Sequence, residues 1–556
     1  MSTPATLLRR LAAGTVLALL TVTATAPSLH PVEAQSPAAS GAALIAESDM
    51  RRWLSTLASD AMQGRGAFTE GYGLAAAYVA AELEAMGATP LGDHGGYLRT
   101  VTRGEYRVTR RSSLRITAAG KTQTFAQGDH VSFAPLAGSA RRLSFDAIEF
   151  AGYGLPPVGE PPPDYTGKLV VLLPGTPADL RGNWPYPPAF ATGAGRAAAI
   201  ADAGAAGVIV LGAVPPTATG SDGGPPAVGL TTVRRTDRPR APVITADDEV
   251  FALLFGGTDA FERLRTRAQR GEPLDAQPLT GIDVVVDIDH RYEVVRLERT
   301  HNVVAMVPGR DPELRERYVA FGAHLDHVGA VTGPSLPGRV NVPIEQDPIW
   351  NGADDNASGS TALLAIARAL LEGPRPRRST LFVWHAAEEE GLLGSRAFVD
   401  DPPVPLEAIE AQINIDMIGR NRDDDASEAR TVYVIGADRI STDLHNRLVE
   451  VNGRLGEPVT LDFHYNDPDD PESFYTRSDH YNYAARGVPA VFFFTGTHRD
   501  YHANTDSADR ILYPKLLRIT RYIYEAGFAV ADGEPLRRDF RGPRAGRGFR
   551  GTLPSD

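Results

Sequence analysis

Two histidines and an aspartate stand at the end of an apolar run in the stretch AFGAHLDHVG, residues 320–329. The chain has only 13 His among 556 residues, so His324, Asp326 and His327 are a notable concentration of titratable groups. Burying such groups costs free energy unless they are paired or coordinate a metal. The pattern therefore favours a metal site at the end of this run.

Polar groups follow other apolar runs in the same way. They are Asp354 and Asp355 in NGADDNASG, Glu388–Glu390 in AAEEEG, Asp416 in NIDMIG and His502 in DYHANTD. In open α/β sheets, ligands bind outside the carboxyl ends of the strands, so these side chains are expected to converge on one rim. Carboxylates gathered there would repel one another unless a cation neutralised them.

The chain has no cysteine, so a metal must be held by histidines and carboxylates. Such ligands suit zinc, and manganese or cobalt would also fit. Two metals about 3.5–4 Å apart can clamp a water and stabilise a tetrahedral intermediate. A neighbouring carboxylate that stays off the metal could then move the proton of that water.

The elements that must position these groups alternate between strands and helices over residues 295–531. Strands are predicted at 302–309, 317–324, 379–386, 410–417, 431–437 and 488–496, and the clearest helix at 359–373. This alternation predicts a mixed, mostly parallel sheet flanked by helices. Residues 41–140 are assigned to the same domain, with helices within 41–63 and 71–88 followed by a β-type region.

Residues 141–275 differ in texture and are predicted to form an inserted module. The short apolar run at 164–175 predicts a buried strand, and 195–214 predicts a helix, a turn and a strand. Loops rich in Pro and Gly surround them. No 20–50-residue period repeats, which argues against a solenoid.

The composition and the terminal segments indicate which partners and which cellular location are expected. The net charge of −13 argues against nucleic acid as a partner, because phosphate binding needs a basic face. Residues 1–34 are typical of a signal peptide, with Arg9 and Arg10 before an apolar run and cleavage expected after Ala34. No stable membrane anchor is expected, and the predicted location is periplasmic or extracellular. The Gly-, Pro- and Arg-rich residues 532–556 are predicted to be disordered.

Several motifs occur in the order typical of one family. They are HLDHVG, NGADDNASG, AAEEEGLLGS, NIDMIG, SDHYNY and DYHANTD. With them, the chain resembles the M28 zinc peptidases that carry an inserted protease-associated (PA) domain, over residues 45–530. The stretches YTGKLVVLLPG and AGAAGVIVLG are similar to PA domains, which are non-catalytic and commonly shape access to the cleft. The resemblance implies a zinc exopeptidase-like fold.

The resemblance also implies a ligand set for two zinc ions per chain. The implied ligands are His324, Asp355, Glu389, Asp416 and His502. Asp355 would bridge the two ions, with His324 and Asp416 on one and Glu389 and His502 on the other. A cis peptide bond is expected between Asp355 and Asn356.

Three further residues receive catalytic roles from the resemblance. Glu388 corresponds to the general base, and Asp326 to the residue that orients the active-site groups from behind the ligands. Tyr501 stands where several relatives use a Tyr hydroxyl to stabilise the oxyanion. Ala503 replaces a Thr that the family often has after the last ligand, which puts one minor contact in doubt.

The implied function is that of an exported zinc aminopeptidase acting on peptide substrates, with Glu388 as base for a water activated by two zincs. The same fold also serves carboxypeptidases, dipeptidases and glutaminyl cyclases, and some PA-containing relatives are non-catalytic receptors. A cyclase usually lacks one metal site and a receptor lacks ligands, whereas this chain keeps all five. A carboxypeptidase would need a cationic pocket, which the sequence does not reveal. The oligomeric state is left open.

Other polar residues have plainer interpretations. His327 is expected to support the site from behind the ligands or to belong to a loop, and His385 to be structural. Asp479 and His480 either shape the substrate pocket or cap a helix. Arg420 is expected to form a salt bridge within its loop. Acidic runs near 423–425 and 467–472 are expected to be solvated loops rather than calcium sites.

Overall fold

The computed structural model describes residues 41–108, 112–133, 141–156, 163–180, 186, 190, 192–214, 227–232, 241–289, 292–332, 335–467 and 470–539. The predicted signal peptide and residues 540–556 of the predicted tail lie outside these residues. Among the described helices, none has the length and apolar character needed to cross a bilayer.

The helices are α1 (Glu47–Leu57), α2 (Glu70–Met86), α3 (Gly193–Asp202), α4 (Asp248–Leu254), α5 (Thr258–Arg270), α6 (Gly359–Glu372), α7 (Leu393–Asp400), α8 (Ala437–Ile440), α9 (Thr442–Arg454), α10 (His480–Ala484) and α11 (Tyr513–Asp532). The larger sheet contains β1 (Thr89–Pro90), β2 (Leu98–Val108), β10 (Ala227–Thr232), β14 (Tyr292–Val307), β15 (Tyr318–His324), β18 (Ser379–His385), β19 (Ile409–Ile415), β20 (Thr431–Ile435), β21 (Thr460–Asp462) and β22 (Ala490–Phe494). The remaining strands are β3 (Ser113–Ala118), β4 (Lys121–Ala126), β5 (Val131–Phe133), β6 (Arg141–Phe145), β7 (Ile148–Phe150), β8 (Leu169–Leu172), β9 (Gly207–Leu211), β11 (Val243–Ala246), β12 (Gln277–Leu279), β13 (Ile282–Ile288), β16 (Gly329–Ala330) and β17 (Ile349–Trp350).

The larger sheet has the strand order β10–β2–β14–β18–β15–β19–β22–β20–β21, with β1 on β14. Its central strands β18, β15, β19 and β22 are all parallel. Each flank joins the centre through an antiparallel pair, since β14 runs against β18 and β20 runs against β22, while β21 is parallel to β20. The mixed α/β fold is as predicted, and the parallel part is confined mainly to the centre.

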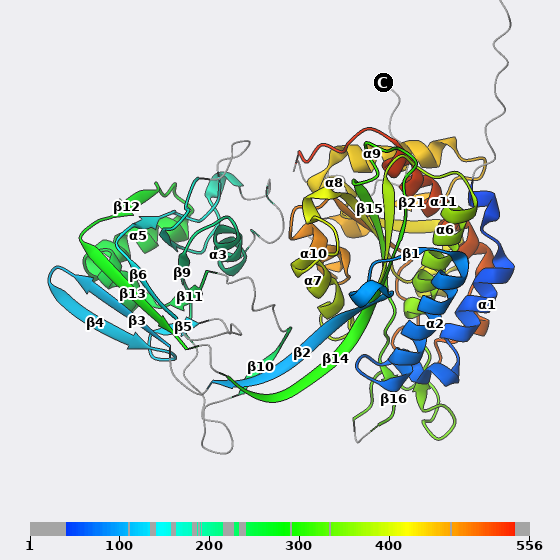
Figure 1. Ribbon diagram of the computed structural model, residues 1–556, viewed down its shortest axis with the longest axis horizontal. Helices are drawn as coiled ribbons and strands as arrows, with labels where there is room; N and C mark the ends of the chain where they lie inside the picture. Colours follow the sequence, from blue (N-terminus) through cyan, green and yellow to red (C-terminus); the bar gives the residue numbers. More distant parts are fainter. Residues whose placement is uncertain are drawn as a thin grey trace, which may run out of the picture. The chain divides into compact units, whose positions relative to one another are not determined.

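Uninterrupted apolar runs place these central strands inside the domain. Every residue of β18, β19 and β22 is buried, as expected for parallel strands covered on both faces. Figure 1 shows α1, α2, α6 and α11 on one side of the sheet and α7 and α10 on the other. Phe321 and Phe382 pack in the core on the side of α1, α2, α6 and α11. Leu381 and Val383 pack on the other side, with Phe398 of α7.

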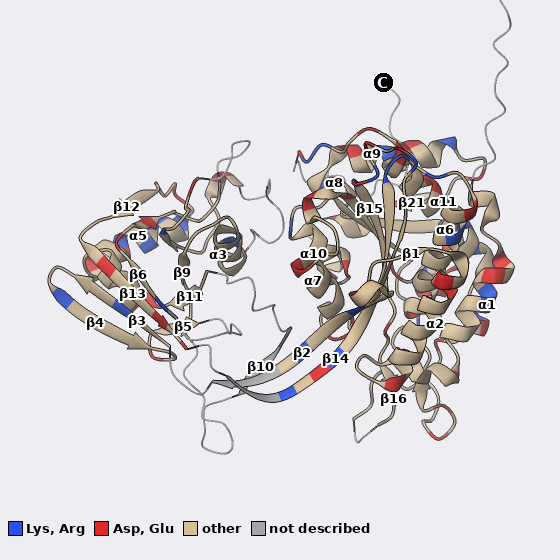
Figure 2. Cartoon of the chain, in the orientation of Figure 1, with Lys and Arg blue, Asp and Glu red and all other residues tan. Residues whose placement is uncertain are grey.

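Charged side chains are nearly absent from the four central strands, where Glu410 of β19 is the exception. Strands β15 and β18 contain no Asp, Glu, Lys or Arg, whereas Figure 2 shows charge on the outer helices α1 and α2. Helix α2 begins at the N-cap Thr69, whose hydroxyl accepts from the Tyr72 N–H, and ends at Gly87 with φ 75°. Helix α1 lies within the predicted range 41–63, and α2 begins one residue before the predicted range 71–88.

Two further sheets contain the strands from the part of the chain that was predicted to be an inserted module. One has the order β12–β7–β8–β9–β11–β5, and the other β4–β3–β13–β6. Strands β3, β4 and β5 precede residue 141 and pair only within these sheets, and β13 extends to Ile288. These two sheets take their strands from residues between 113 and 288, a range that contains the predicted module of residues 141–275, and β13 pairs with β3 across it.

Candidate metal centre

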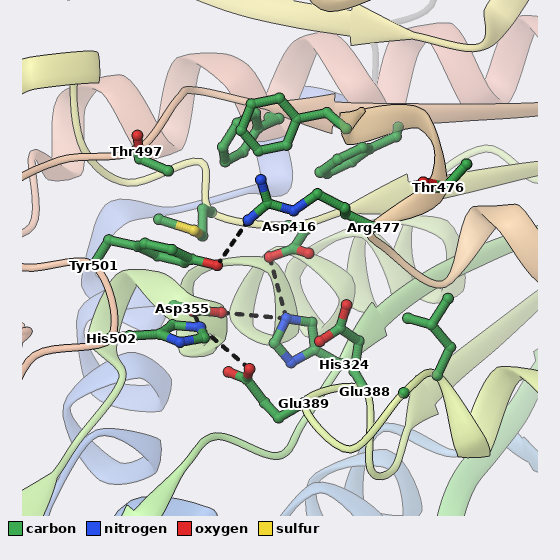
Figure 3. Close-up of a pocket in the computed structure, with 16 residues that line it drawn as sticks. His324, Asp355, Glu388, Glu389, Asp416, Thr476, Arg477, Thr497, Tyr501 and His502 are labelled. Atoms are coloured by element: carbon green, nitrogen blue, oxygen red, sulfur yellow. Dashed lines mark hydrogen bonds and ion pairs between the residues drawn. The ribbon is translucent and has the colours of Figure 1, made fainter. Parts of the chain in front are cut away.

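The parallel strands bring the predicted ligands to one edge of the sheet. His324 ends β15, Glu389 follows β18, Asp416 follows β19 and His502 follows β22. Asp355 lies in η6 (Ala353–Ser358), the irregular helical turn that leads into α6. Figure 3 shows these side chains directed into one pocket. All five predicted ligands therefore meet in space.

The five side chains divide into two groups that share Asp355. On one side, His324 Nε2 lies 3.2 Å from Asp416 Oδ1 and 3.3 Å from Asp355 Oδ1. On the other, His502 Nε2 lies 3.0 Å from Asp355 Oδ2 and 3.1 Å from Glu389 Oε2. Each oxygen of Asp355 thus faces a different histidine, which is the geometry of a bridging carboxylate. The peptide between Asp355 and Asn356 is cis, as expected.

The ligand types and spacing fit divalent cations. The ligand atoms of His324, Asp355 and Asp416 all lie within 4.8 Å of one another, as do those of His327, Asp355 and Glu389. Imidazole nitrogens and carboxylate oxygens are ordinary zinc ligands. The residues present therefore suit two adjacent metal ions.

The pKa values of His324 and His502 show that the surrounding carboxylates favour positive charge at the site. Burial opposes protonation of His324, yet Asp416, Glu388 and Asp355 raise its pKa well above the usual range. Burial likewise disfavours His502 as a cation, yet Asp355 and Glu389 raise its pKa to about 10. The carboxylates here thus stabilise positive charge, which is the role a divalent cation would fill.

Glu388 differs from Glu389 although the two are neighbours. Its carboxylate lines the pocket and makes no hydrogen bond within the described part of the chain, whereas Glu389 contacts His502 and His327. Burial, and repulsion from Glu389 and Asp416, raise the pKa of Glu388 well above its usual value. A raised pKa makes the carboxylate of Glu388 a better proton acceptor, which suits a general base.

Asp326 holds the loop that carries both glutamates. Its Oδ1 accepts from the Glu388 N–H at 3.0 Å, and its Oδ2 accepts from the Glu389 N–H at 3.2 Å. The Asp326 carbonyl also accepts from Nδ1 of His324 at 3.0 Å, which leaves Nε2 of that ring facing the carboxylates. Asp326 is fully buried and contacts the ligands from behind, the place that the resemblance implied.

Comparison with known proteins identifies the family. Residues 302–527 match the family described as Peptidase family M28, and this range contains the whole cluster. This part of the chain is a peptidase family M28 domain. Leucine aminopeptidase 1 of Coccidioides posadasii (strain C735) is 27% identical over 259 residues, which cover 43% of this chain and 60% of that protein. Leucine aminopeptidase 1 of Trichophyton equinum is 29% identical over 236 residues, covering 41% and 55%.

The chain therefore spans about 55–60% of the length of these curated relatives. Among solved structures, BSAP, a zinc aminopeptidase from Bacillus subtilis, aligns with a TM-score of 0.41 and 18% identity. That alignment covers 90% of this chain and 98% of the other.

Two supporting residues of the M28 domain escaped sequence reasoning. Asp506 accepts from the backbone N–H groups of Asp354 and Asp355, at 3.0 and 3.1 Å from its Oδ2. Ser478 donates its hydroxyl to Asp416 Oδ2 at 2.7 Å. Both stand in the motifs DYHANTD and SDHYNY, which were the only signal for them.

Arg65 is a further supporting residue, which ends the short helix η2 (Asp60–Arg65), far from the motifs in sequence. Its buried guanidinium donates to the carbonyls of Leu57, Leu325, Asn351 and Gly352 at 2.7–2.8 Å. Burial lowers its pKa to about 10, still far above neutral. Arg65 therefore joins the loop after β15 to the one before η6, and adds positive charge beneath the site.

His327 supports Glu389 from behind. Its Nδ1 lies 2.9 Å from Glu389 Oε1, while Glu389 Oε2 faces His502. The ring packs on Gly352, where an added Cβ would lie 2.5 Å from His327 Cγ. Since Nδ1 also lies 3.7 Å from Asp355 Oδ2, His327 is close enough to join the second group of ligand atoms.

The remaining polar residues have separate roles. Asp479 occupies the N-cap position of α10 but makes no capping hydrogen bond, and it does not line the pocket. His385 is fully buried, and burial lowers its pKa to about 3, which fits a structural role. Arg420 pairs with Asp424 and Asp500, the loop salt bridge that was predicted.

Tyr501 stands over the ligands beside a pocket of about 290 Å³. Burial and the nearby carboxylates raise the pKa of its hydroxyl, so it stays protonated and able to donate. In Figure 3 this hydroxyl points into the pocket toward Arg477. One part of the wall is apolar, formed by Leu392, Met417, Phe474, Phe492 and Phe494.

Proposed function

We propose that the protein is an exported, zinc-dependent aminopeptidase that removes N-terminal residues from peptides. The observation that carries the proposal is the shared carboxylate of Asp355, whose two oxygens face His324 and His502 at 3.3 and 3.0 Å. Asp416 and Glu389 complete the two groups. This arrangement would hold two zinc ions per chain.

The chemistry requires a nucleophile, a proton carrier and a place for negative charge. When bound, two zinc ions would lower the pKa of water and polarise the scissile carbonyl. Glu388 would take a proton from the attacking water as the new C–O bond forms. It would return that proton to the amide nitrogen as the C–N bond breaks. The Tyr501 hydroxyl would donate a hydrogen bond to the developing oxyanion.

An N-terminal amine suits the electrostatics of this pocket. Glu388, Glu389 and Asp416 line it, so a protonated amine would find carboxylates beside the reacting bond. The relatives named leucine aminopeptidase support the same choice. The apolar part of the wall would accept an apolar side chain of the substrate.

Export and the role of the inserted module complete the proposal. The pattern of residues 1–34 supports export to the periplasm or the medium. The module's likeness to PA domains rests on its sequence, and we assign it a part in shaping access to the cleft.

Exchange of Glu388 tests the proposed chemistry. Glu388→Gln keeps the shape of the side chain but cannot carry the proton, so kcat should fall by about 10²- to 10⁴-fold. Zinc content should stay at the wild-type level, because Glu388 is not among the ligands. The assay compares leucine p-nitroanilide with its N-acetylated form, which an aminopeptidase should not cleave.

Glu390→Gln provides the matched control. Glu390 pairs with Arg103, and glutamine can still accept from that guanidinium. This variant should keep most of its activity. Undiminished activity of Glu388→Gln would refute the role of Glu388, and cleavage of only the N-acetylated substrate would refute the aminopeptidase assignment.

A further inference from the structure

One cationic side chain lines the pocket together with the predicted metal ligands. Among the described residues that line it, Arg477 is the only Lys or Arg. It lies between η11 (Phe474–Thr476) and α10, and its guanidinium stands 4.5 Å from the centre of the Phe474 ring. Figure 3 shows it above Asp416 and next to Tyr501.

The guanidinium of Arg477 is weakly engaged by the protein itself. Nη2 lies 3.4 Å from the Tyr501 hydroxyl, and Nη1 lies 3.4 Å from the Glu472 carbonyl. The Glu472 carboxylate is 3.7 Å away and 59% exposed, so this ion pair is loose and screened by water. Arg477 itself remains 38% exposed.

Two other arginines near the site are buried by comparison, and although Nη1 of Arg420 has no partner among the described residues, burial keeps it from solvent. Arg420 contacts the carboxylates of Asp424 and Asp500 at 2.5 and 3.2 Å, and its side chain is 5% exposed. Arg65 donates to four backbone carbonyls. Of these three described arginines, Arg477 is thus the one that lines the pocket and exposes its donors to a ligand.

We propose that Arg477 binds a carboxylate that the substrate carries within one residue of the scissile bond; this inference rests on the proposed peptidase function. A guanidinium matches the planar geometry of a carboxylate and can donate two parallel hydrogen bonds to it. Because Arg477 touches the hydroxyl of Tyr501, a carboxylate held there lies close to the reacting carbonyl. Two substrate groups meet that distance: the α-carboxylate of a dipeptide and the side chain of an N-terminal Asp or Glu.

Two pairs of substrates distinguish these sources. Leu-Leu and Leu-Leu-amide differ only in the α-carboxylate, while glutamyl and glutaminyl p-nitroanilide differ only in the side-chain charge. The wild type should favour the charged member of one pair. Arg477→Gln should lower kcat/KM for that member by about 10- to 100-fold and change the neutral member by less than about threefold.

Arg499→Gln is the matched control, because Arg499 is 70% exposed and does not line the pocket. It should leave all four rates nearly unchanged. A loss in Arg477→Gln that is equal for charged and neutral members, or no loss, would overturn the role of Arg477 while leaving the peptidase intact. Failure of the zinc-loaded wild type to cleave any of the four substrates would instead refute the proposed function and this inference with it.

Discussion

Exchange of Asp506 for asparagine tests whether backbone hydrogen bonds behind the ligands set the affinity for metal. Asp506 is fully buried and contacts no predicted metal position directly. Its carboxylate accepts from two successive N–H groups, those of Asp354 and Asp355. Asp506→Asn keeps the volume of the side chain but removes its charge and one acceptor oxygen.

The size of the effect follows from these contacts. Hydrogen bonds to a charged group contribute about 1.5–3 kcal/mol each. In Asp506→Asn, one bond is lost or both become neutral, so Asp355 should be held less firmly by about 1.5–3 kcal/mol. Zinc should then bind about 10- to 100-fold more weakly, since each 1.4 kcal/mol is tenfold.

Competition against a chromophoric chelator measures this zinc affinity in the full chain. Asp509→Asn is the matched control three residues away, since Asp509 lies on the surface, where it accepts from Ser507 Oγ. It should bind zinc as the wild type does. If folded Asp506→Asn bound zinc within about threefold of the wild type, the reasoning would be refuted.

Two further predictions concern stability. Burial lowers the pKa of His385 to about 3 in the folded protein, whereas the same side chain has a pKa near 6.5 in the unfolded chain. The unfolded chain therefore binds the proton more tightly, and the free energy of unfolding falls as the pH drops from 6.5 toward 3. Between pH 7 and pH 5, the free energy of unfolding of His385→Gln should fall by about 2 kcal/mol less than that of the wild type. Urea unfolding at equal zinc concentration measures this, and equal losses in the two proteins would contradict it. Arg65→Met should lower the unfolding free energy by about 3–5 kcal/mol, because four buried carbonyls lose their donor. Arg65→Lys should restore part of it, and a Met variant as stable as the wild type would disprove the role of Arg65.

The centre of the fold could be predicted because its strands are continuous apolar runs with polar residues at their ends. Runs such as 379–386 and 488–496 are long enough to identify strands, and β18 and β22 lie there. The carboxyl ends of parallel strands share one edge, so Asp416 and His324 had to be neighbours once the sheet was parallel.

The flanks of the larger sheet and the pairing of β3 were less predictable because they depend on contacts between distant segments. Strand β14 reaches β15 through a short connection with no crossover helix, so it runs antiparallel to the central strands. Strand β3 finds its partner β13 about 165 residues later, and nothing in residues 113–118 reveals that choice.

The supporting residues were missed for a related reason. Arg65 and Asp506 bind backbone groups, which every residue has and which therefore leave no pattern in the sequence. Arg65 and the Leu325 carbonyl are separated by 260 positions. Only the folded chain shows that these side chains hold the loops that carry His324 and Asp355.

The most direct test of the whole account is the zinc content of the purified full chain, measured by atomic emission after excess metal has been removed. The shared carboxylate of Asp355 between His324 and His502 predicts two zinc ions per chain. A value of one, or none, in folded protein supplied with zinc would contradict the two-zinc centre on which the proposed function rests.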